Sequence, residues 1–139
     1  MTTGSVERGA GDLVIRVTAM PTDLNPYGGV FGGWLMAQLA LGAASLVTRR
    51  TRLKAVVVGA TDFAFPDTMQ VGDELNVFAE VQRIGRTSMT VRTRGFGRAR
   101  AGETQREVAN GTFTFVVLGD DDRPCRIVDG TKESAGDRG

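Results

Sequence analysis

The sequence predicts an α+β fold in which one long helix packs against one face of an antiparallel sheet. Two observations lead to this class. A single segment between residues 30 and 50 is rich in Ala, Leu and Met and contains no proline, as a helix requires. The segments around it have the alternation and the β-branched content of strands, and short turns separate them. Strands joined by short turns pair antiparallel, so one helix and five strands fit this class.

The first element is expected to be a strand that begins at Asp12. Apolar and other side chains alternate along it, so one face of the strand should be buried. That face would be formed by Leu13, Ile15, Val17 and Ala19. Residues 21–29 hold two prolines and two glycines and are expected to form a structured loop.

The helix is expected over residues 30–50 and should be buried on most sides, because it is apolar nearly all round. Arg49 and Arg50 stand at its end, where the helix dipole favours cations. Gly32, Gly33 and Gly42 each cost stability inside a helix. Each therefore indicates the close approach of another part of the chain or of a ligand.

Four strand-like segments follow the helix, and we expect consecutive strands to pair as a meander. The segments are residues 53–66, 73–85, 86–100 and 103–119. Arginines recur at even spacing on the third of them, which predicts a solvated outer face of the sheet. These arginines are Arg92, Arg94, Arg98 and Arg100.

Length and composition exclude several classes of protein. A chain of 139 residues predicts one domain, expected over residues 12–128 with flexible ends at 1–11 and 129–139. The chain contains no His, which excludes Ser-His-Asp triads and His-ligated metal sites. A net charge of +1 gives no reason to expect nucleic acid or a membrane as a partner. The single Cys125 excludes an internal disulfide and is expected to be inert.

The location follows from what the chain lacks. Its first residues do not have the pattern of a signal peptide. Its longest apolar stretch, residues 30–47, is interrupted by small and polar residues and is short for a membrane span. We therefore expect a soluble cytoplasmic protein.

Three motifs stand in one order along the chain: AMPTDLNPYGGVFGGWLMAQL, FAFPDTMQVGDEL and VQRIGRTSMTV. Together they resemble the short bacterial acyl-CoA thioesterases of the hotdog superfamily, the YciA type, from about residue 15 to residue 118. The resemblance implies a sheet wrapped around the helix, a dimer paired through sheet edges, and possible trimers of dimers. It further implies active sites at the dimer interface and hydrolysis of acyl-CoA to the free acid and CoA. It implies no metal and no cofactor, since CoA is part of the substrate.

The resemblance assigns the thioester oxygen to Gly32 and Gly33 at the start of the helix. The residues themselves agree, because unpaired amides and the positive end of the helix dipole suit a developing oxyanion. The alternative is that these glycines only allow close packing. The resemblance also gives Asn25 the role of orienting or polarising the attacked group, where the alternative is a loop Asn that bonds its own backbone.

The catalytic carboxylate of the family would fall at Ala40, so the general base or nucleophile is missing. Two other positions that are often acidic in relatives hold Gly29 and Gly59, and no acid occurs between residues 30 and 48. Asp62 is the nearest substitute, as an acid inside an otherwise apolar strand. The alternative is a strand-end Asp that bonds nearby backbone or an Arg. Asp23 is expected to be structural and to cap loop amides.

The substrate-binding residues are also taken from the resemblance. The turn of Arg86, Thr87 and Ser88, with Arg83 nearby, offers cations and hydroxyls for the nucleotide end of CoA. Tyr27 is expected as a lid over the thioester. Phe31 is a further substrate-binding candidate. By residue type, four side chains could line an acyl tunnel, although aromatic and Met residues at such spacings more often belong to the plain core: Trp34, Leu35, Met36 and Phe63.

Two functions therefore compete. The first is an acyl-CoA thioesterase that works with Asn25, the glycine-rich helix start, and either Asp62 or a directly held water. The second is a hotdog protein that binds acyl-CoA as a regulatory or carrier module and has lost hydrolysis. A hotdog dehydratase is disfavoured, because those enzymes rely on a His.

Overall fold

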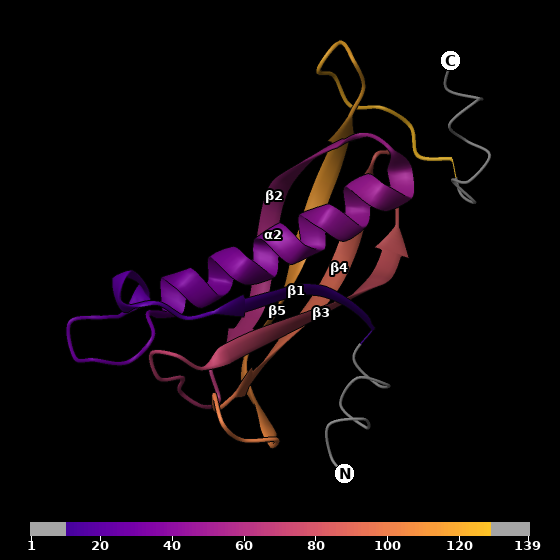
Figure 1. Ribbon diagram of the computed structural model, residues 1–139. Coiled ribbons are helices and arrows are strands. Elements are labelled where there is room, and N and C mark those ends of the chain that lie inside the picture. Colours follow the sequence, from indigo (N-terminus) through magenta and orange to yellow (C-terminus); the bar gives the residue numbers. More distant parts are fainter. Residues whose placement is uncertain (1–10, 129–139) are drawn as a thin grey trace.

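The computed structural model describes residues 11–128. Residues 11–128 form a five-stranded antiparallel sheet and one long helix. Figure 1 shows this helix running across one face of the sheet, so the predicted α+β class is confirmed. The flexible ends expected at 1–11 and 129–139 lie outside the described residues, apart from Gly11. No helix within residues 11–128 is both long enough and apolar enough to cross a membrane.

The elements fall close to the predicted ranges. The strands are β1 (Asp12–Thr18), β2 (Lys54–Ala64), β3 (Glu74–Ile84), β4 (Ser88–Arg98) and β5 (Gln105–Leu118). The helix is α2 (Gly32–Thr51), and a single 3-10 turn, η1 (Pro21–Asp23), follows β1.

The predicted pairing of consecutive strands is only partly right. The sheet order is β1-β3-β4-β5-β2, so β3, β4 and β5 form a meander, but β2 lies beside β5 and not beside β3. The reason is the connection at residues 65–73, which is too long for a tight hairpin and crosses the end of the sheet. As a result β1 and β2 are the two edge strands.

The predicted alternation along β1 is interrupted by a bulge between Leu13 and Ile15. Leu13 is 44% exposed, which corrects the expectation that it faces the core. Val14 and Ile15 instead both lie against Gly42 of the helix. A bulge shifts which side chains face the core, and nothing in the local alternation indicates its position.

One stripe of α2 is buried against the sheet, and it repeats every fourth residue. The stripe consists of Leu35, Leu39, Ala43 and Val47. The opposite face is open, with Leu41 59% exposed, so within one chain the helix is not buried on most sides as expected. The close approach of another part of the chain that we expected at Gly42 is confirmed, because an added Cβ would lie 2.6 Å from Cγ2 of Val14.

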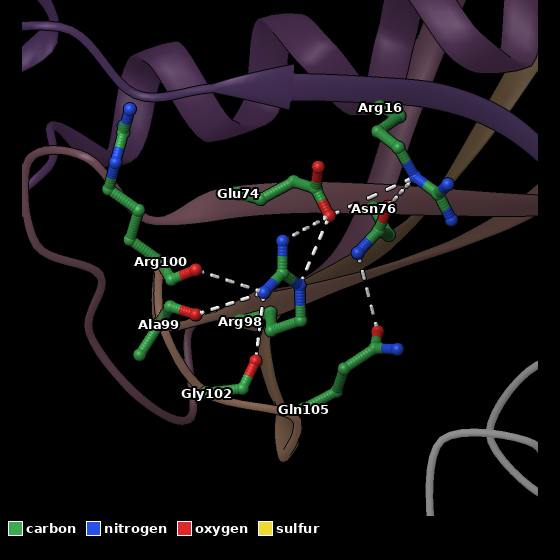
Figure 2. A network of polar contacts seen from close by, with 8 residues as sticks. All are labelled: Arg16, Glu74, Asn76, Arg98, Ala99, Arg100, Gly102 and Gln105. Atoms are coloured by element: carbon green, nitrogen blue, oxygen red, sulfur yellow. Dashed lines mark hydrogen bonds and ion pairs between the residues drawn. The ribbon is translucent and has the colours of Figure 1, made fainter.

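The arginines of β4 face the outer side of the sheet, as predicted, but they are half-buried and paired. Arg92 donates to Thr112 and Asn110, and Arg94 makes two hydrogen bonds to Glu107. Figure 2 shows Arg98 between Glu74 and the carbonyl groups of the following turn. The expectation of a merely solvated face is therefore wrong for these three, while Arg100 is exposed.

The pair formed by Arg94 and Glu107 makes stability depend on pH. The hydrogen bond from Arg94, together with its charge, lowers the pKa of Glu107 against the opposing effect of burial. A lowered pKa stabilises the folded chain above the unfolded-state value of about 4.3, and this contribution is lost as pH falls through the lower folded-state pKa. We expect Glu107→Gln to be less stable than the parent at pH 7, with the difference shrinking below about pH 4. Denaturant unfolding at pH 7, 5, 4 and 3 checks this, and a difference independent of pH would contradict it.

Candidate functional site

The loop before α2 is held by its own backbone. Leu24 and Val30 form an isolated antiparallel bridge, and the N–H of Asn25 donates to the carbonyl of Gly29 at 2.7 Å. The N–H of Gly28, which has a positive φ, donates to the carbonyl of Asn25. The predicted structured loop is therefore present.

Asn25 organises this loop through its side chain. Its Oδ1 accepts hydrogen bonds from the N–H groups of Tyr27 at 2.7 Å and Gly29 at 3.1 Å. The structural alternative considered for Asn25 is thus realised by the oxygen. The Nδ2 group donates to no residue within 11–128, so it remains available to a ligand.

Asp23 has the structural role that we expected. Its Oδ2 accepts a hydrogen bond from the N–H of Met20 at 2.8 Å, and its main-chain carbonyl accepts one from the N–H of Phe31. Both bonds join the entry of the loop to its exit. This position of the chain therefore fixes where the helix begins.

The helix start presents two free amides. The carbonyl of Phe31 accepts hydrogen bonds from Trp34 and Leu35, whereas the N–H groups of Gly32 and Gly33 have no acceptor among residues 11–128. An added Cβ at Gly32 would lie 3.7 Å from the Phe65 ring, which is ordinary contact, so close packing does not require this glycine. Free amides at a helix N-terminus, with the dipole behind them, attract negative charge.

Gly33 is exposed, and the Phe31 side chain lies beside it. An added Cβ there would lie 2.5 Å from Cε2 of the Phe31 ring, and that ring is itself largely exposed. Phe31 is the N-cap residue of α2, so its ring stands beside the two free amides. Tyr27 is 92% exposed and covers nothing within the described chain, so its role as a lid stays a prediction.

The missing carboxylate is evident in the geometry. Ala40 is half-buried and lies seven residues after Gly33, on the same side of the helix. No residue of α2 is acidic. Any acid that serves this site must therefore come from another element or another chain.

Asp62 does not occupy a dry site. It is exposed and has a left-handed backbone conformation, with φ of 58°, inside a bulge where β2 loses register with β5. This corrects the expectation of an acid buried in an apolar strand. The physical reason is that the bulge turns the residue out of the alternation.

Two of the expected pocket residues, Leu35 and Phe63, belong to the core. Leu35 is buried, and Trp34 and Met36 are half-buried, Trp34 against the core. Phe63 packs edge-on against Phe113 with ring centroids 5.1 Å apart. The core alternative therefore holds for Leu35 and Phe63.

The expected CoA-binding turn lies at the other end of the molecule. Figure 1 shows β3 ending near the C-terminal end of α2, whereas the loop with Asn25 precedes its N-terminal end. A helix of this length spans about 30 Å. The carbonyls of Arg86 and Thr87 accept hydrogen bonds from Ile127 and Val117, and Ser88 begins β4. One chain therefore does not bring this turn and the loop together.

A cleft of about 570 Å³ also lies at that distant end. It opens between the start of β1 and the last turns of α2, and it is lined by Asp12, Leu13, Val14, Leu46, Arg49, Arg50 and Arg52. None of the expected site residues lines it. Residues 11–128 contain no group of three or more Cys, Asp or Glu side chains placed to hold a metal ion.

The sequence reasoning gave no role to the connection at residues 65–73. Its Phe65 ring lies beside Gly32, and the carbonyl of Met69 accepts a hydrogen bond from the N–H of Val30 at 3.1 Å. Arg106 of β5 reaches the same connection. The motif FAFPDTMQVGDEL was the available signal, since it places Phe65, Met69 and Val71 in the connection, but its contact with the helix start could not be predicted from the sequence.

Comparison with known proteins gives a consistent result. Residues 27–100 match the thioesterase superfamily. An uncharacterized acyl-CoA thioester hydrolase of Zymomonas mobilis is 40% identical over 118 residues, which cover 85% of this chain and 79% of that protein. The acyl-CoA thioester hydrolase YciA of Salmonella typhimurium is 32% identical over 117 residues, which cover 82% of this chain and 88% of YciA.

Solved structures agree with these sequences. The hexameric thioesterase y2039 from Yersinia pestis superimposes with a TM-score of 0.82 at 30% identity, over 86% of this chain and 98% of that one. HI0827, a hexameric broad specificity acyl-coenzyme A thioesterase, gives a TM-score of 0.81 at 28% identity, over 91% of this chain and 88% of that one.

Proposed function

We propose that this chain, which belongs to the thioesterase superfamily and has its hotdog fold, hydrolyses acyl-CoA thioesters to the free acid and CoA. The observation that carries the proposal is the pair of free amides of Gly32 and Gly33 at the start of α2. Water attacks the thioester carbon, and the carbonyl oxygen takes up negative charge that these amides stabilise. The carbon–sulfur bond then breaks, and the sulfur leaves as the CoA thiol after taking a proton.

Two side chains are candidates to assist. The free Nδ2 group of Asn25 can donate a hydrogen bond to the substrate while its Oδ1 holds the loop. Asp62, exposed on an edge strand, can act as a base on water only where a neighbouring chain or the substrate brings it close to the thioester. A directly held water is the alternative source of the nucleophile.

The proposed active unit is a homodimer paired through β2, and three dimers would make a hexamer like those of the structural relatives. The outer edge of β2 pairs with no strand among residues 11–128, and its Val56, Val57 and Val58 are between 43 and 60% exposed. Such an apolar edge strand is a template for pairing with a second copy. An antiparallel partner would bring its turn of Arg86, Thr87 and Ser88 toward the helix start of the first chain.

No metal or cofactor enters the proposed reaction, since water and the thioester supply every atom. A cytoplasmic location is proposed with it. The one Cys of the chain suits a reducing compartment.

Ala40 favours a second candidate function. With no carboxylate on α2, the chain could bind acyl-CoA as a regulatory or carrier module without hydrolysing it. This second function would use the same amides of Gly32 and Gly33 and the same turn of Arg86, Thr87 and Ser88. Only a measurement of turnover therefore separates the two functions.

The deciding experiment measures thiol release from a series of acyl-CoAs of increasing chain length, alongside calorimetric binding of each. Turnover above that of buffer supports the hydrolase. Tight binding with no turnover would support the binding module and reject the hydrolase.

The role of Gly32 can be separated from its effect on stability. An added methyl has room beside Phe65, so Gly32→Ala should leave stability within about 1 kcal/mol of the parent. The methyl stands beside the free amides, so we expect kcat to fall about tenfold or more. Gly42→Ala is the matched control and should lower stability without changing kcat. Unchanged turnover in Gly32→Ala would remove these amides from the mechanism.

A further inference from the structure

The connection at residues 65–73 is held between the sheet and the loop that precedes α2. Met69 is fully buried, and its side chain lies against Gly97 of β4. The N–H of Ala19 donates to the carbonyl of Asp73 at 3.0 Å, and the N–H of Gly72 donates to the carbonyl of Ala19 at 2.8 Å. The connection therefore has a defined position relative to the end of β1.

The same connection touches the helix start directly at two points. The carbonyl of Met69 accepts the N–H of Val30, two residues before Gly32. The ring of Phe65 lies beside Gly32 itself. A shift of the connection would therefore shift the two free amides.

Arg106, near the start of β5, binds this connection at three places. Its Nη2 donates to the carbonyl of Thr68 at 2.6 Å and lies 3.4 Å from Oδ2 of Asp73. Its Nε lies 3.3 Å from Oδ2 of Asp67. Asp73 is buried, and the same Oδ2 atom accepts the N–H of Gln70 at 3.0 Å. One planar guanidinium thus joins both ends of the connection, a geometry that an ammonium group cannot reproduce.

We propose that Arg106 is a positioning residue for the reaction, because it clamps residues 65–73 and so holds the amides of Gly32 and Gly33 in place. The inference rests on the proposed function for its effect on turnover. Arg106 does not touch the substrate. Its effect passes through Met69 and Phe65, and a displacement of about 1 Å at a reacting centre can cost about a hundredfold in rate.

Arg94 supplies a matched control. It lies on the neighbouring strand, is similarly half-exposed and makes two hydrogen bonds to Glu107, but it contacts no residue of the connection. Arg94→Met therefore removes a comparable ion pair from the same sheet. Any effect specific to Arg106→Met must come from the clamp.

The experiment compares Arg106→Met, Arg106→Lys and Arg94→Met, at a temperature at which all are folded. In Arg106→Met we expect kcat to fall about tenfold to a hundredfold with KM changed less than about threefold, since positioning acts on the transition state. Arg106→Lys should recover part of the loss, and Arg94→Met should keep kcat within about twofold of the parent. Equal kcat in Arg106→Met and Arg94→Met would overturn the proposal.

A second readout does not depend on activity. Amide hydrogen exchange of Val30 should accelerate about tenfold or more in Arg106→Met and remain unchanged in Arg94→Met, because the Met69 carbonyl loses its fixed position. Unchanged exchange in Arg106→Met would overturn the clamp even if the chain proves to be a binding module. Absence of turnover in the parent chain, with accelerated exchange in Arg106→Met, would reject the hydrolase and retain the clamp.

Discussion

Replacing Ala40 by Asp is expected to raise kcat for acyl-CoA hydrolysis about a hundredfold or more, the range that a positioned general base contributes. Ala40 lies on the same side of α2 as Gly33 and about 10 Å further along the helix axis. Helical side chains point back toward the N-terminus, so a carboxylate at this position is directed toward the free amides. Ala40 is only half-buried, so the new charge keeps part of its hydration and the fold should tolerate it.

Ala44→Asp is the control for this prediction. Ala44 is also half-buried and lies one turn further on, about 6 Å from Ala40 along the axis. The Ala44→Asp substitution adds the same charge to the same helix, but its carboxylate lies further from the free amides of Gly32 and Gly33. The turnover of this variant should therefore stay at the parent level. Thiol release and binding are measured for both variants. If the Ala40→Asp protein folds and binds acyl-CoA but its kcat does not rise, then a carboxylate on this helix does not act as the general base.

The sequence predicted the elements well, because each has a local signature. The composition of residues 30–50 and the alternation of the strands depend only on neighbouring residues, and the five strands and the long helix lie close to where they are expected. The place of β2 beside β5 could not be predicted, because strand order is decided by the path of the connection at residues 65–73. The bulge at Leu13 was missed for the same reason, since it is a property of two paired strands and not of one.

In the candidate site, too, the features set by neighbouring residues were predicted, and those set by distant parts of the chain were not. Asn25 and the glycines at the helix start are close in sequence, and the structure bonds Asn25 to Gly29 and Asp23 to Phe31, the residue before those glycines. Asp62 was placed on the correct strand but in the wrong environment, because its exposure depends on the pairing with β5. Arg106 is one of 17 basic residues, and only the fold shows that its guanidinium meets a distant connection.

The second large effect is expected at Gly111 of β5. Asp62 and Phe63 of β2 together oppose this one glycine, and the Phe63 ring lies directly over it, so an added Cβ would overlap the ring. Gly111→Val should therefore expel Phe63 from its contact with Phe113. We expect a loss of about 2–3 kcal/mol in the free energy of unfolding, although valine favours strands more than glycine does.

Denaturant unfolding of Gly111→Val and of Gly59→Ala measures this effect. Gly59 lies in the same pair of strands, but its added Cβ would lie 3.7 Å from Thr114, which is ordinary contact, so Gly59→Ala should unfold at nearly the parent midpoint. Phe63→Leu should partly rescue Gly111→Val, because the smaller side chain makes room for the new methyl groups, and the two changes should couple by about 1 kcal/mol. A Gly111→Val protein as stable as the parent would mean that the bulge accommodates both side chains.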